Sequence, residues 1–326
     1  MNVQFINVGH GDTILLEWQS YSGTNMVGII DCCQPEGIDQ IEDYLATNSI
    51  SNIEFIVLSH PHKDHFSGLH ALLTYIESHK IQVNHFVHTL FVDPIYLNWA
   101  EANELDRKKL RELLNLVIGL NSKKIINQVQ LAVLNWQMNL GNNYIIKSLS
   151  PSDSELRTFA DKIEYFKEEN RYLCSTAANY LSTIFVISNG NTRKSILLTS
   201  DATDYSFERL FNSKQITEEI CTFQIPHHGS SKNHFKKFWD SLKLIPDKFA
   251  VVSSGFNEKY KLPDYEVIEY FDNLGCRVIS TNFVHGYKEY FEKIPKGSND
   301  KSNALDDNSE QIITHYSYKP QICCSF

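Results

Sequence analysis

Four side chains with metal-binding chemistry fall within six residues, in the segment HPHKDH at positions 60–65. Imidazole suits zinc and other borderline metals, and a carboxylate adds a hard oxygen ligand. His60 and His62 are two residues apart, so an extended backbone can point both at one ion. Asp64 and His65 are adjacent, so a turn can direct them to a second ion. The spacing therefore predicts a site for two metal ions rather than one.

The remaining ligands of such a site must come from the ends of other strands. The apolar run ILLTS at 196–200 leads directly into Asp201, a candidate to bridge the two ions. Taken alone, Asp201 would fit a turn or a helix cap better. The run FQIP at 223–226 leads into His227 and His228. One of this pair is expected to bind metal, and the other to support the site or contact the leaving group.

The elements that hold these side chains alternate between strands and helices. The first 60 residues have a hairpin-rich pattern, and the run 53–58 before the histidines suits a strand buried on both faces. Ser152 and Glu155 have the spacing of a capping box, which predicts a helix start. This interleaving indicates a layered α/β fold. Strands are also predicted at 144–149, 181–188, 195–199, 249–253 and 277–279, and helices at 67–78, 101–117 and 263–274.

No stretch of the 326 residues has the character of a boundary between two cores. We therefore expect one domain over 1–295, with a mostly helical insertion at about 93–142. Residues 296–310 are polar, lack aromatic residues and have no periodicity, which indicates a linker. A last strand is predicted at 312–318, within a C-terminal tail over 296–326.

Composition excludes several classes of protein. A hydrophobic content of 42% with 12% aromatic residues is too high for a disordered chain. No apolar run approaches the roughly 20 residues that span a bilayer. The N-terminus lacks the features of a signal peptide, and the seven cysteines include no CxxC, which together predict a cytoplasmic protein with free thiols. The net charge of −9 argues against a surface coated with phosphate-binding cations. A local basic stretch at 107–111 is either a solvated helix face or a patch beside a substrate groove.

Six segments, taken in order, resemble the metallo-β-lactamase superfamily: FINVGHGDTILLE, GIIDCC, VLSHPHKDHFSGL, SLSP, ILLTSDA and QIPHHGSSKN. The resemblance is closest to the branch that contains the hydrolase domain of the DNA-uptake protein ComEC. That branch also contains stand-alone hydrolases and choline-phosphate esterases. The resemblance extends over about residues 1–290, and HxHxDH is its most specific part. It implies a four-layer αβ/βα sandwich with the metals at one sheet edge.

The resemblance also implies roles by position. His60 and His62 would bind the first metal. Asp64 and His65 would bind the second, and Asp201 would bridge the two.

Other positions would support this centre. His227 or His228 would complete a metal shell, and Asp31 would act from the second shell. Asp12 and Asn179 also fall on recurrent positions of the family.

Two segments depart from the family pattern. The common start DVGQGD is here NVGHGD, with Asn7 and His10, which we interpret as tolerable variation. The common YGHP is here YKLP at 260–263, so Leu262 stands where a histidine is expected. One metal would then lack a ligand, bind more weakly or recruit another residue. His285 is a candidate substitute ligand, and the sequence agrees equally well with a histidine that ends a strand and binds no metal.

The implied cofactors are two divalent ions, with Zn²⁺ favoured and Mn²⁺ open, that hold a bridging hydroxide. His62 argues against the diiron branch of the superfamily, which usually carries glutamate there. The leading hypothesis is a phosphodiesterase that acts on nucleic acid or another phosphodiester. The residues expected to take part in hydrolysis are Asp64, His227 and His228. Three side chains after the HHG turn could contact a phosphate, namely Ser230, Ser231 and Lys232.

Two alternatives remain open at this point. A small neutral pocket would favour a lactone, thioester or phosphocholine ester as substrate. A site that has lost one metal with the change at Leu262 would favour a binding module without catalysis.

Overall fold

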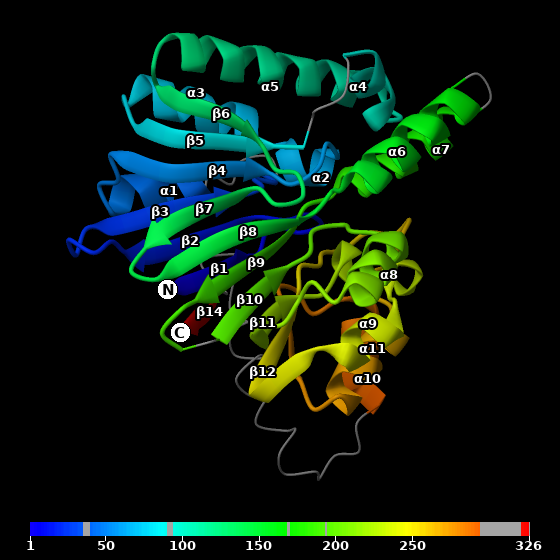
Figure 1. Cartoon of the computed structure of the whole chain (residues 1–326). Coiled ribbons are helices and arrows are strands. Elements are labelled where there is room, and N and C mark those ends of the chain that lie inside the picture. Colours follow the sequence, from blue (N-terminus) through cyan, green and yellow to red (C-terminus); the bar gives the residue numbers. More distant parts are fainter. Residues whose placement is uncertain (35–39, 90–93, 168–169, 193, 294–320, 326) are drawn as a thin grey trace.

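Two seven-stranded sheets form the centre of the molecule (Figure 1). The computed structural model describes residues 1–34, 40–89, 94–167, 170–192, 194–293 and 321–325. The first sheet has the order β14-β1-β2-β3-β4-β5-β6. Its strands are β1 (Asn2–Ile6), β2 (Ile14–Gln19), β3 (Asn25–Ile30), β4 (Asn52–Leu58), β5 (Gln82–His88), β6 (Ile126–Leu131) and β14 (Gln321–Ser325).

The second sheet has the order β13-β12-β11-β10-β9-β8-β7. Its strands are β7 (Gln137–Gly141), β8 (Tyr144–Ser150), β9 (Ile184–Asn189), β10 (Lys194–Leu198), β11 (Glu219–Gln224), β12 (Lys243–Val252) and β13 (Arg277–Ser280). Strands β10 to β13 run parallel to one another, as do β3 to β6 in the first sheet.

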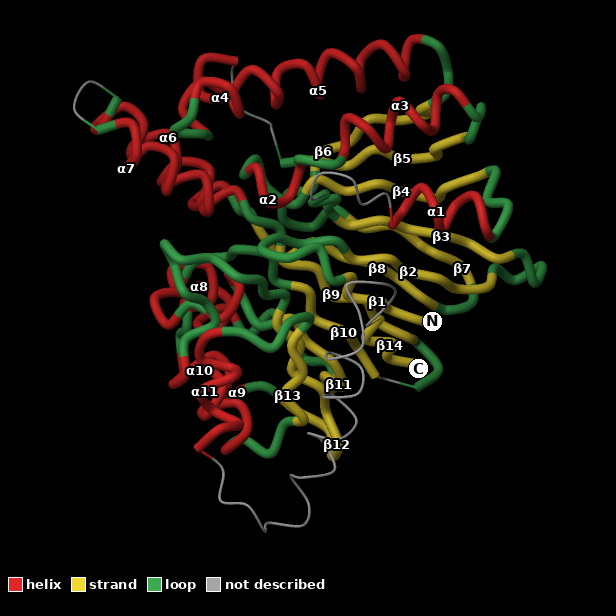
Figure 2. The backbone as a smooth tube through the Cα atoms, turned by 180° about the vertical axis from the view of Figure 1, so that it is seen from behind, coloured by secondary structure: helices red, strands yellow, loops and turns green. Residues whose placement is uncertain are grey.

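Helices cover the outer face of each sheet, so the molecule has four layers (Figures 1 and 2). On the first sheet lie α1 (Gln40–Thr47), α3 (Leu69–Ser78) and α5 (Glu104–Ser122). On the second lie α8 (Asp204–Ser213), α9 (Lys236–Ser241), α10 (Tyr265–Asn273) and α11 (His285–Lys293). The shorter helices are α2 (Lys63–Phe66), α4 (Pro94–Ala100) and α7 (Arg171–Ala177), and α6 (Asp153–Phe166) precedes α7. The expected four-layer α/β sandwich is confirmed.

Strand β4 shows how the first sheet packs on both of its faces. Its residues Ile53, Ile56 and Leu58 are buried against the helices of the first sheet. Phe55 and Val57, which alternate with them, are buried between the two sheets. A strand with apolar residues on both faces is stable only in the middle of such a layered fold. The prediction of a strand buried on both faces is confirmed, and β4 ends just before Ser59 and the histidines.

The capping box predicted at Ser152 is present. The Ser152 amide donates to Glu155 Oε2 at 2.9 Å. The second oxygen of this buried carboxylate accepts from Arg209 Nε at 2.8 Å. The start of α6 is thereby tied to α8, the helix that follows Asp201.

The segment 93–142 differs from its prediction. The described part of it is helical up to Ser122, in α4 and α5, but β6 and β7 form strands. Strand β6 pairs in parallel with β5, and β7 pairs with β8. These are edge strands whose backbone hydrogen bonds to a neighbour decide the conformation, which local composition does not reveal. The linker 296–310 and the strand at 312–318 lie outside the described residues.

Strand β14 pairs antiparallel with β1 at the edge of the first sheet. None of the helices in the described ranges is both long and apolar enough to cross a bilayer.

Gly28 in β3 allows a test of the packing between the sheets. A Cβ atom there would lie 2.3 Å from Phe55 Cζ, in the fully buried layer between the sheets. We expect Gly28→Ala to lower the free energy of unfolding by about 1–3 kcal/mol, because the Phe55 ring must move. Denaturant unfolding measures this change.

Gly119 in α5 provides the matched control, since nothing lies within 4 Å of an added Cβ. Gly119→Ala is expected to raise the free energy of unfolding by about 0.5–1 kcal/mol, because alanine favours the helix. Equal effects of the two substitutions would contradict the packing described.

Candidate metal centre

Histidine and aspartate side chains from both sheets meet at one edge of the sandwich. The segment after β4 contributes His60, His62 and, in α2, Asp64 and His65, and the turn after β10 contributes Asp201. Strands β4 and β10 belong to different sheets, and the packing of the two sheets against each other brings the segments that follow these strands together.

Two groups of potential metal ligands share Asp201. The first consists of His60, His62 and Asp201. The second consists of Asp64, His65, Asp201 and His228. Within each group the ligand atoms lie within 4.8 Å of one another. The two groups separate His60 and His62 from Asp64 and His65, as the spacing along the chain also does.

Each of three histidine rings is held by one nitrogen and turns the other toward the cluster. His62 Nε2 lies 2.9 Å from the Ser175 carbonyl oxygen. His228 Nδ1 lies 3.0 Å from the Ser253 carbonyl oxygen. His65 Nδ1 lies 2.7 Å from Asp31 Oδ2. An outer partner of this kind fixes the tautomer and ring orientation of a metal-binding histidine.

Three buried atoms of the second group find no hydrogen-bond partner among the described residues: His65 Nε2, His228 Nε2 and Asp201 Oδ1. An unsatisfied buried polar atom costs about 1–3 kcal/mol, so native structures rarely bring several together. All three belong to the second ligand group. Their convergence fits a divalent cation bound to nitrogen and oxygen donors.

The same atoms show strong electrostatic coupling. Burial disfavours the charged form of His228, but the carboxylates of Asp201 and Asp64 outweigh it and raise its pKa to about 9. Burial also opposes ionisation of Asp201, yet His227 and His228 hold the pKa of its carboxyl well below the usual range. The carboxylates thus attract positive charge into the cluster. A metal ion that binds here displaces protons from the imidazoles.

Asp31 and Asp12 both lie beside His65, on the side away from the cluster centre. Asp31 accepts from the Ser59 amide at 2.7 Å and from Ser59 Oγ at 2.5 Å, besides its contact with His65. Asp12 Oδ2 lies 3.8 Å from His65 Nδ1. The structure therefore places both aspartates where the sequence expected supporting residues.

His227 and His228 both reach Asp201, one at each carboxylate oxygen. His227 Nε2 lies 3.6 Å from Oδ2, and His228 Nε2 lies 3.8 Å from Oδ1. Both residues have left-handed backbones, with φ of 48° and 53°. Such a conformation is unfavourable outside glycine and clusters at functional sites. The sequence left open which histidine serves the centre, and the structure brings both to it.

The other predicted residues lie around the centre rather than in it. His285 Nε2 accepts from the Asn257 amide at 3.1 Å, and His285 belongs to none of the ligand groups found among the described residues. Asn179 is buried in the turn 178–181, with an unpartnered Oδ1. Leu262 is buried, and its side chain offers no ligand atom.

The three residues after the HHG turn differ in their accessibility. Ser230 is buried, and the Ser231 amide donates to Asp264 Oδ2 at 2.8 Å. Lys232 is exposed in the short turn 231–233. Only Lys232 of the three is freely accessible to solvent.

His10 is a residue of the centre that the sequence interpretation missed. Its Nε2 lies 3.6 Å from Asp64 Oδ2, and its ring centroid lies 4.6 Å from that of His228. Burial, followed by the nearby charge of His228, lowers its pKa to about 4, so the ring is neutral. The signal was present, because NVGHGD has a histidine where the family has glutamine.

Gln224 is a second residue that the sequence did not reveal. Its Nε2 donates to Asp12 Oδ2 at 2.8 Å. Its Oε1 accepts from the amides of Thr199 and Ser200, both at 2.9 Å. Gln224 therefore ties the turn that carries Asp201 to the N-terminal sheet.

The insertion lies against the histidine segment. The Lys63 amide donates to Glu101 Oε1 at 2.5 Å, and Lys63 Nζ lies 3.7 Å from Asp106 Oδ1.

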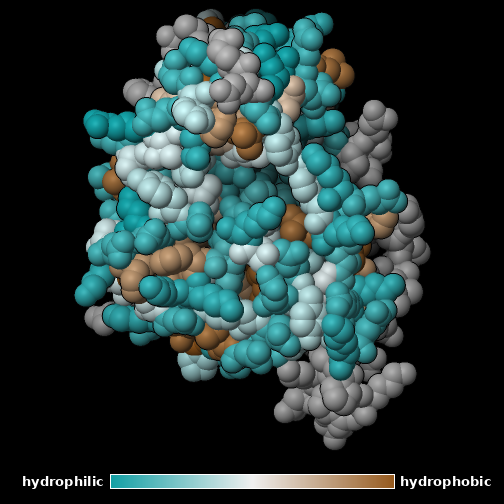
Figure 3. Space-filling view, turned by 90° about the vertical axis from the view of Figure 1, so that its right-hand side faces the viewer, coloured by the Kyte–Doolittle hydropathy of each residue, from teal (hydrophilic) through white to brown (hydrophobic). Residues whose placement is uncertain are grey.

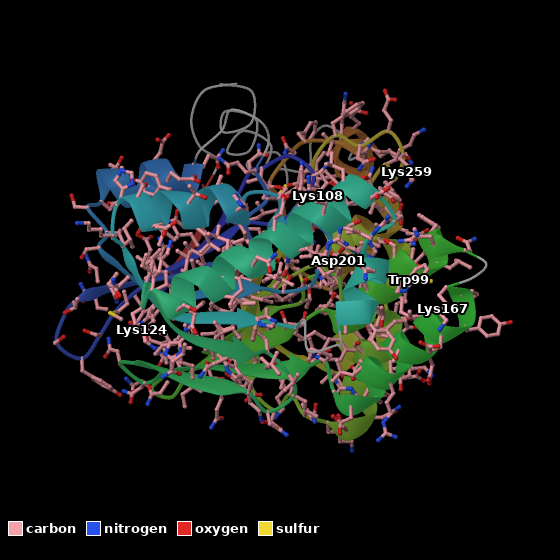
Figure 4. All side chains as sticks on the ribbon, turned by 90° about the horizontal axis from the view of Figure 1, so that it is seen from above. Trp99, Lys108, Lys124, Lys167, Asp201 and Lys259 are labelled. Atoms are coloured by element: carbon pink, nitrogen blue, oxygen red, sulfur yellow. The ribbon has the colours of Figure 1, made fainter. Side chains whose placement is uncertain are left out.

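Figure 4 shows Asp201 in the half of the molecule that also carries Trp99 and Lys259, away from Lys124. Figure 3 shows a hydrophilic hollow near the middle of the side on which α6, α7 and α8 lie.

Comparison with known proteins gives matches only among solved structures, since no family model and no curated protein matches the chain. A mutant of the β-hydroxylase CmlA is similar over 86% of this chain and 52% of its own, with 10% identity and a TM-score of 0.45. The chain thus spans about half the length of that protein.

Two further structures are similar over more of their own length. The metallo-β-lactamase fold protein YhfI from Bacillus subtilis shares 14% identity over 72% of this chain and 76% of its own, with a TM-score of 0.37. A diphosphatase of the PhnP family shares 12% identity over 86% of this chain and 95% of its own, with a TM-score of 0.41. Likenesses at this level assign no activity to this chain.

Metal content tests the shared position of Asp201. We expect the wild type to bind two Zn²⁺ ions per chain and Asp201→Ala to retain fewer than one, because both groups lose a ligand. Elemental analysis after dialysis against Zn²⁺ measures this. His79→Ala, which changes an exposed histidine of the loop after α3, is the control and should keep both ions. Two ions bound to Asp201→Ala would show that the groups do not depend on this carboxylate.

A substitution at Asp31 is expected to weaken metal binding less than Asp201→Ala does, because Asp31 contacts only the outer nitrogen of the His65 ring. Asp31→Asn keeps the volume of the side chain but removes the charge that orients His65 Nδ1. We expect affinity for Zn²⁺ to fall about 10- to 100-fold. Competition with a chelating dye gives the dissociation constant, and an unchanged value would remove Asp31 from the support of the centre.

Proposed function

We propose that this protein is a metal-dependent phosphodiesterase that acts on nucleic acid and uses two divalent ions, Zn²⁺ before Mn²⁺. The observation that carries the proposal is the pair of ligand groups that share the buried carboxylate of Asp201. A shared ligand places two ions side by side, as two-metal hydrolases require. The order of the sequence segments supports assignment to the ComEC-type branch, with residues 1–295 as the hydrolase domain.

Two bound divalent ions would supply a nucleophile from water at neutral pH and stabilise charge on the phosphate oxygens. The chain supplies their ligands and the fixed orientation of each ring. His60 and His62 would hold one ion, Asp64, His65 and His228 would hold the other, and Asp201 would serve both. The partners of the rings, such as the Ser175 and Ser253 carbonyls, keep the donor atoms in place before substrate arrives.

His227 is proposed to contact the leaving-group oxygen. Its side chain is 27% exposed, whereas that of His228 is only 1% exposed, so His227 lies at the open end of the cluster. The structure gives its Nδ1 no hydrogen-bond partner. A substrate can therefore reach the His227 ring beside Asp201, whereas the His228 ring is enclosed.

Three arginines gather where the insertion meets α7, despite the acidic total. Arg111 Nη1 donates to Asn98 Oδ1 at 2.7 Å, and Arg171 Nη1 donates to the Asn98 carbonyl oxygen at 3.0 Å. Burial lowers the pKa of the Arg107 guanidinium, and the nearby charge of Arg171 lowers it further. Arg107 also donates to the carbonyl oxygen of Glu101, whose side chain binds the Lys63 amide. This group of arginines favours an anionic substrate.

A cytoplasmic location is part of the proposal. Cys32, Cys33, Cys174 and Cys276 are buried and form no disulfide within the part of the chain that the structure describes. Free thiols are the usual state in a reducing compartment.

Hydrolysis by the metal-loaded protein tests the function. We expect the wild type with Zn²⁺ or Mn²⁺ to cleave bis(p-nitrophenyl) phosphate and DNA. His60→Ala and Asp64→Ala should lower kcat/KM by about 100-fold or more, because each removes a ligand and with it several kcal/mol of charge stabilisation. His79→Ala should retain full activity. A metal-loaded wild type that cleaves neither substrate would refute the proposal.

A further inference from the structure

A row of aromatic and basic side chains leads from the metal centre to the surface. The His10 ring, next to His228, is followed by the Tyr260 ring at 6.1 Å between centroids, with an angle of 19° between the ring planes. Lys259 Nζ lies 4.5 Å from the centroid of Tyr260 and 5.1 Å from that of Tyr172. We call Tyr172, Lys259 and Tyr260 the tyrosine–lysine platform.

The platform is exposed to solvent, so packing of the core does not account for it. Tyr172 is 47% exposed and Tyr260 is 46% exposed. Lys259 Nζ also lies 2.7 Å from Tyr260 Oη, which keeps the ammonium group close to both rings. Aromatic faces with a fixed cation between them are suited to a planar ligand that carries negative charge.

Both sides of the platform are connected to ligands of the centre. Tyr172 lies in α7, the helix whose Ser175 carbonyl holds His62. Tyr260 lies in the loop after β12, which begins with Ser253, whose carbonyl holds His228. A substrate whose phosphate sits at the centre would therefore have its neighbouring group beside these rings.

We propose that the tyrosine–lysine platform binds the nucleobase next to the scissile phosphate, so that the substrate is a nucleotide phosphodiester. This inference rests on the proposed function. The base would stack on the face of the Tyr172 ring that Lys259 does not cover, and Lys259 would offset the charge of the phosphate. The platform argues against a phosphocholine ester, because the ammonium group of Lys259 already occupies the space that a quaternary ammonium would need.

Three esters with the same leaving group separate these substrates. They are thymidine 5′-(p-nitrophenyl phosphate), methyl p-nitrophenyl phosphate and p-nitrophenyl phosphorylcholine. We expect the Zn²⁺- or Mn²⁺-loaded wild type to have its highest kcat/KM for the thymidine ester. Tyr172→Leu should lower the ratio of kcat/KM between the thymidine and methyl esters about 5- to 150-fold, the range for loss of one stacked base.

Two further variants identify the cause of that loss. Tyr172→Phe keeps the ring and should keep the wild-type ratio. Tyr165→Leu changes a tyrosine of α6 that is 72% exposed and has no place in the platform, so it should behave as the wild type. A loss in Tyr172→Phe equal to that in Tyr172→Leu would overturn stacking as the cause.

The remaining outcomes distinguish this inference from the proposed function. Equal kcat/KM for the thymidine and methyl esters, or a preference for the phosphorylcholine ester, would overturn the inference and leave the hydrolase in place. Hydrolysis of none of the three by the metal-loaded protein would overturn both.

Discussion

The burial of the Asp201 carboxylate is the constraint on which the rest of the site depends. Its side chain is only 2% exposed, and a charge so removed from water is costly unless opposite charge surrounds it. His60 and His227 approach Oδ2, each at 3.6 Å, while His65 approaches Oδ1 at 3.5 Å. Such a carboxylate needs positive charge on both oxygens. That need explains why histidines from distant parts of the chain converge on this one carboxylate.

The sandwich meets this need because both sheets place the carboxyl ends of parallel strands at one edge. Strand β4 delivers the histidine segment from the first sheet, and β10 and β11 deliver Asp201 and the HHG turn from the second. Gln224 joins the two sheets directly, since it binds Asp12 on one side and the amides before Asp201 on the other. The apolar layer between the sheets, with Phe55 fully buried in it, holds the two halves of the site in fixed relation.

The sequence predicted the candidate ligands that directly follow an apolar run, and it missed residues that only their tertiary contacts reveal. The HPHKDH segment after β4 could be interpreted because its ligand spacing and the preceding apolar run lie within one stretch of chain. His10 and Gln224 were missed because each acts on residues far away in the sequence. The strands β6 and β7 were missed for the same reason, since pairing with β5 and β8 determines their conformation. The exclusion of His285 from the ligand groups likewise follows only from its place at the start of α11.

The net charge of −9 describes the whole surface and says little about the site. Part of the negative charge is directed inward, because Asp12, Asp31 and Asp201 are buried beside histidines. The arginines of the insertion and of α7 lie near Asn98 and Glu101, next to the histidine segment, and Lys259 lies on the platform. An anionic substrate responds to the local field, since charges more than about 10 Å away are largely screened at physiological salt. An acidic chain can therefore present a local surface that attracts phosphodiesters.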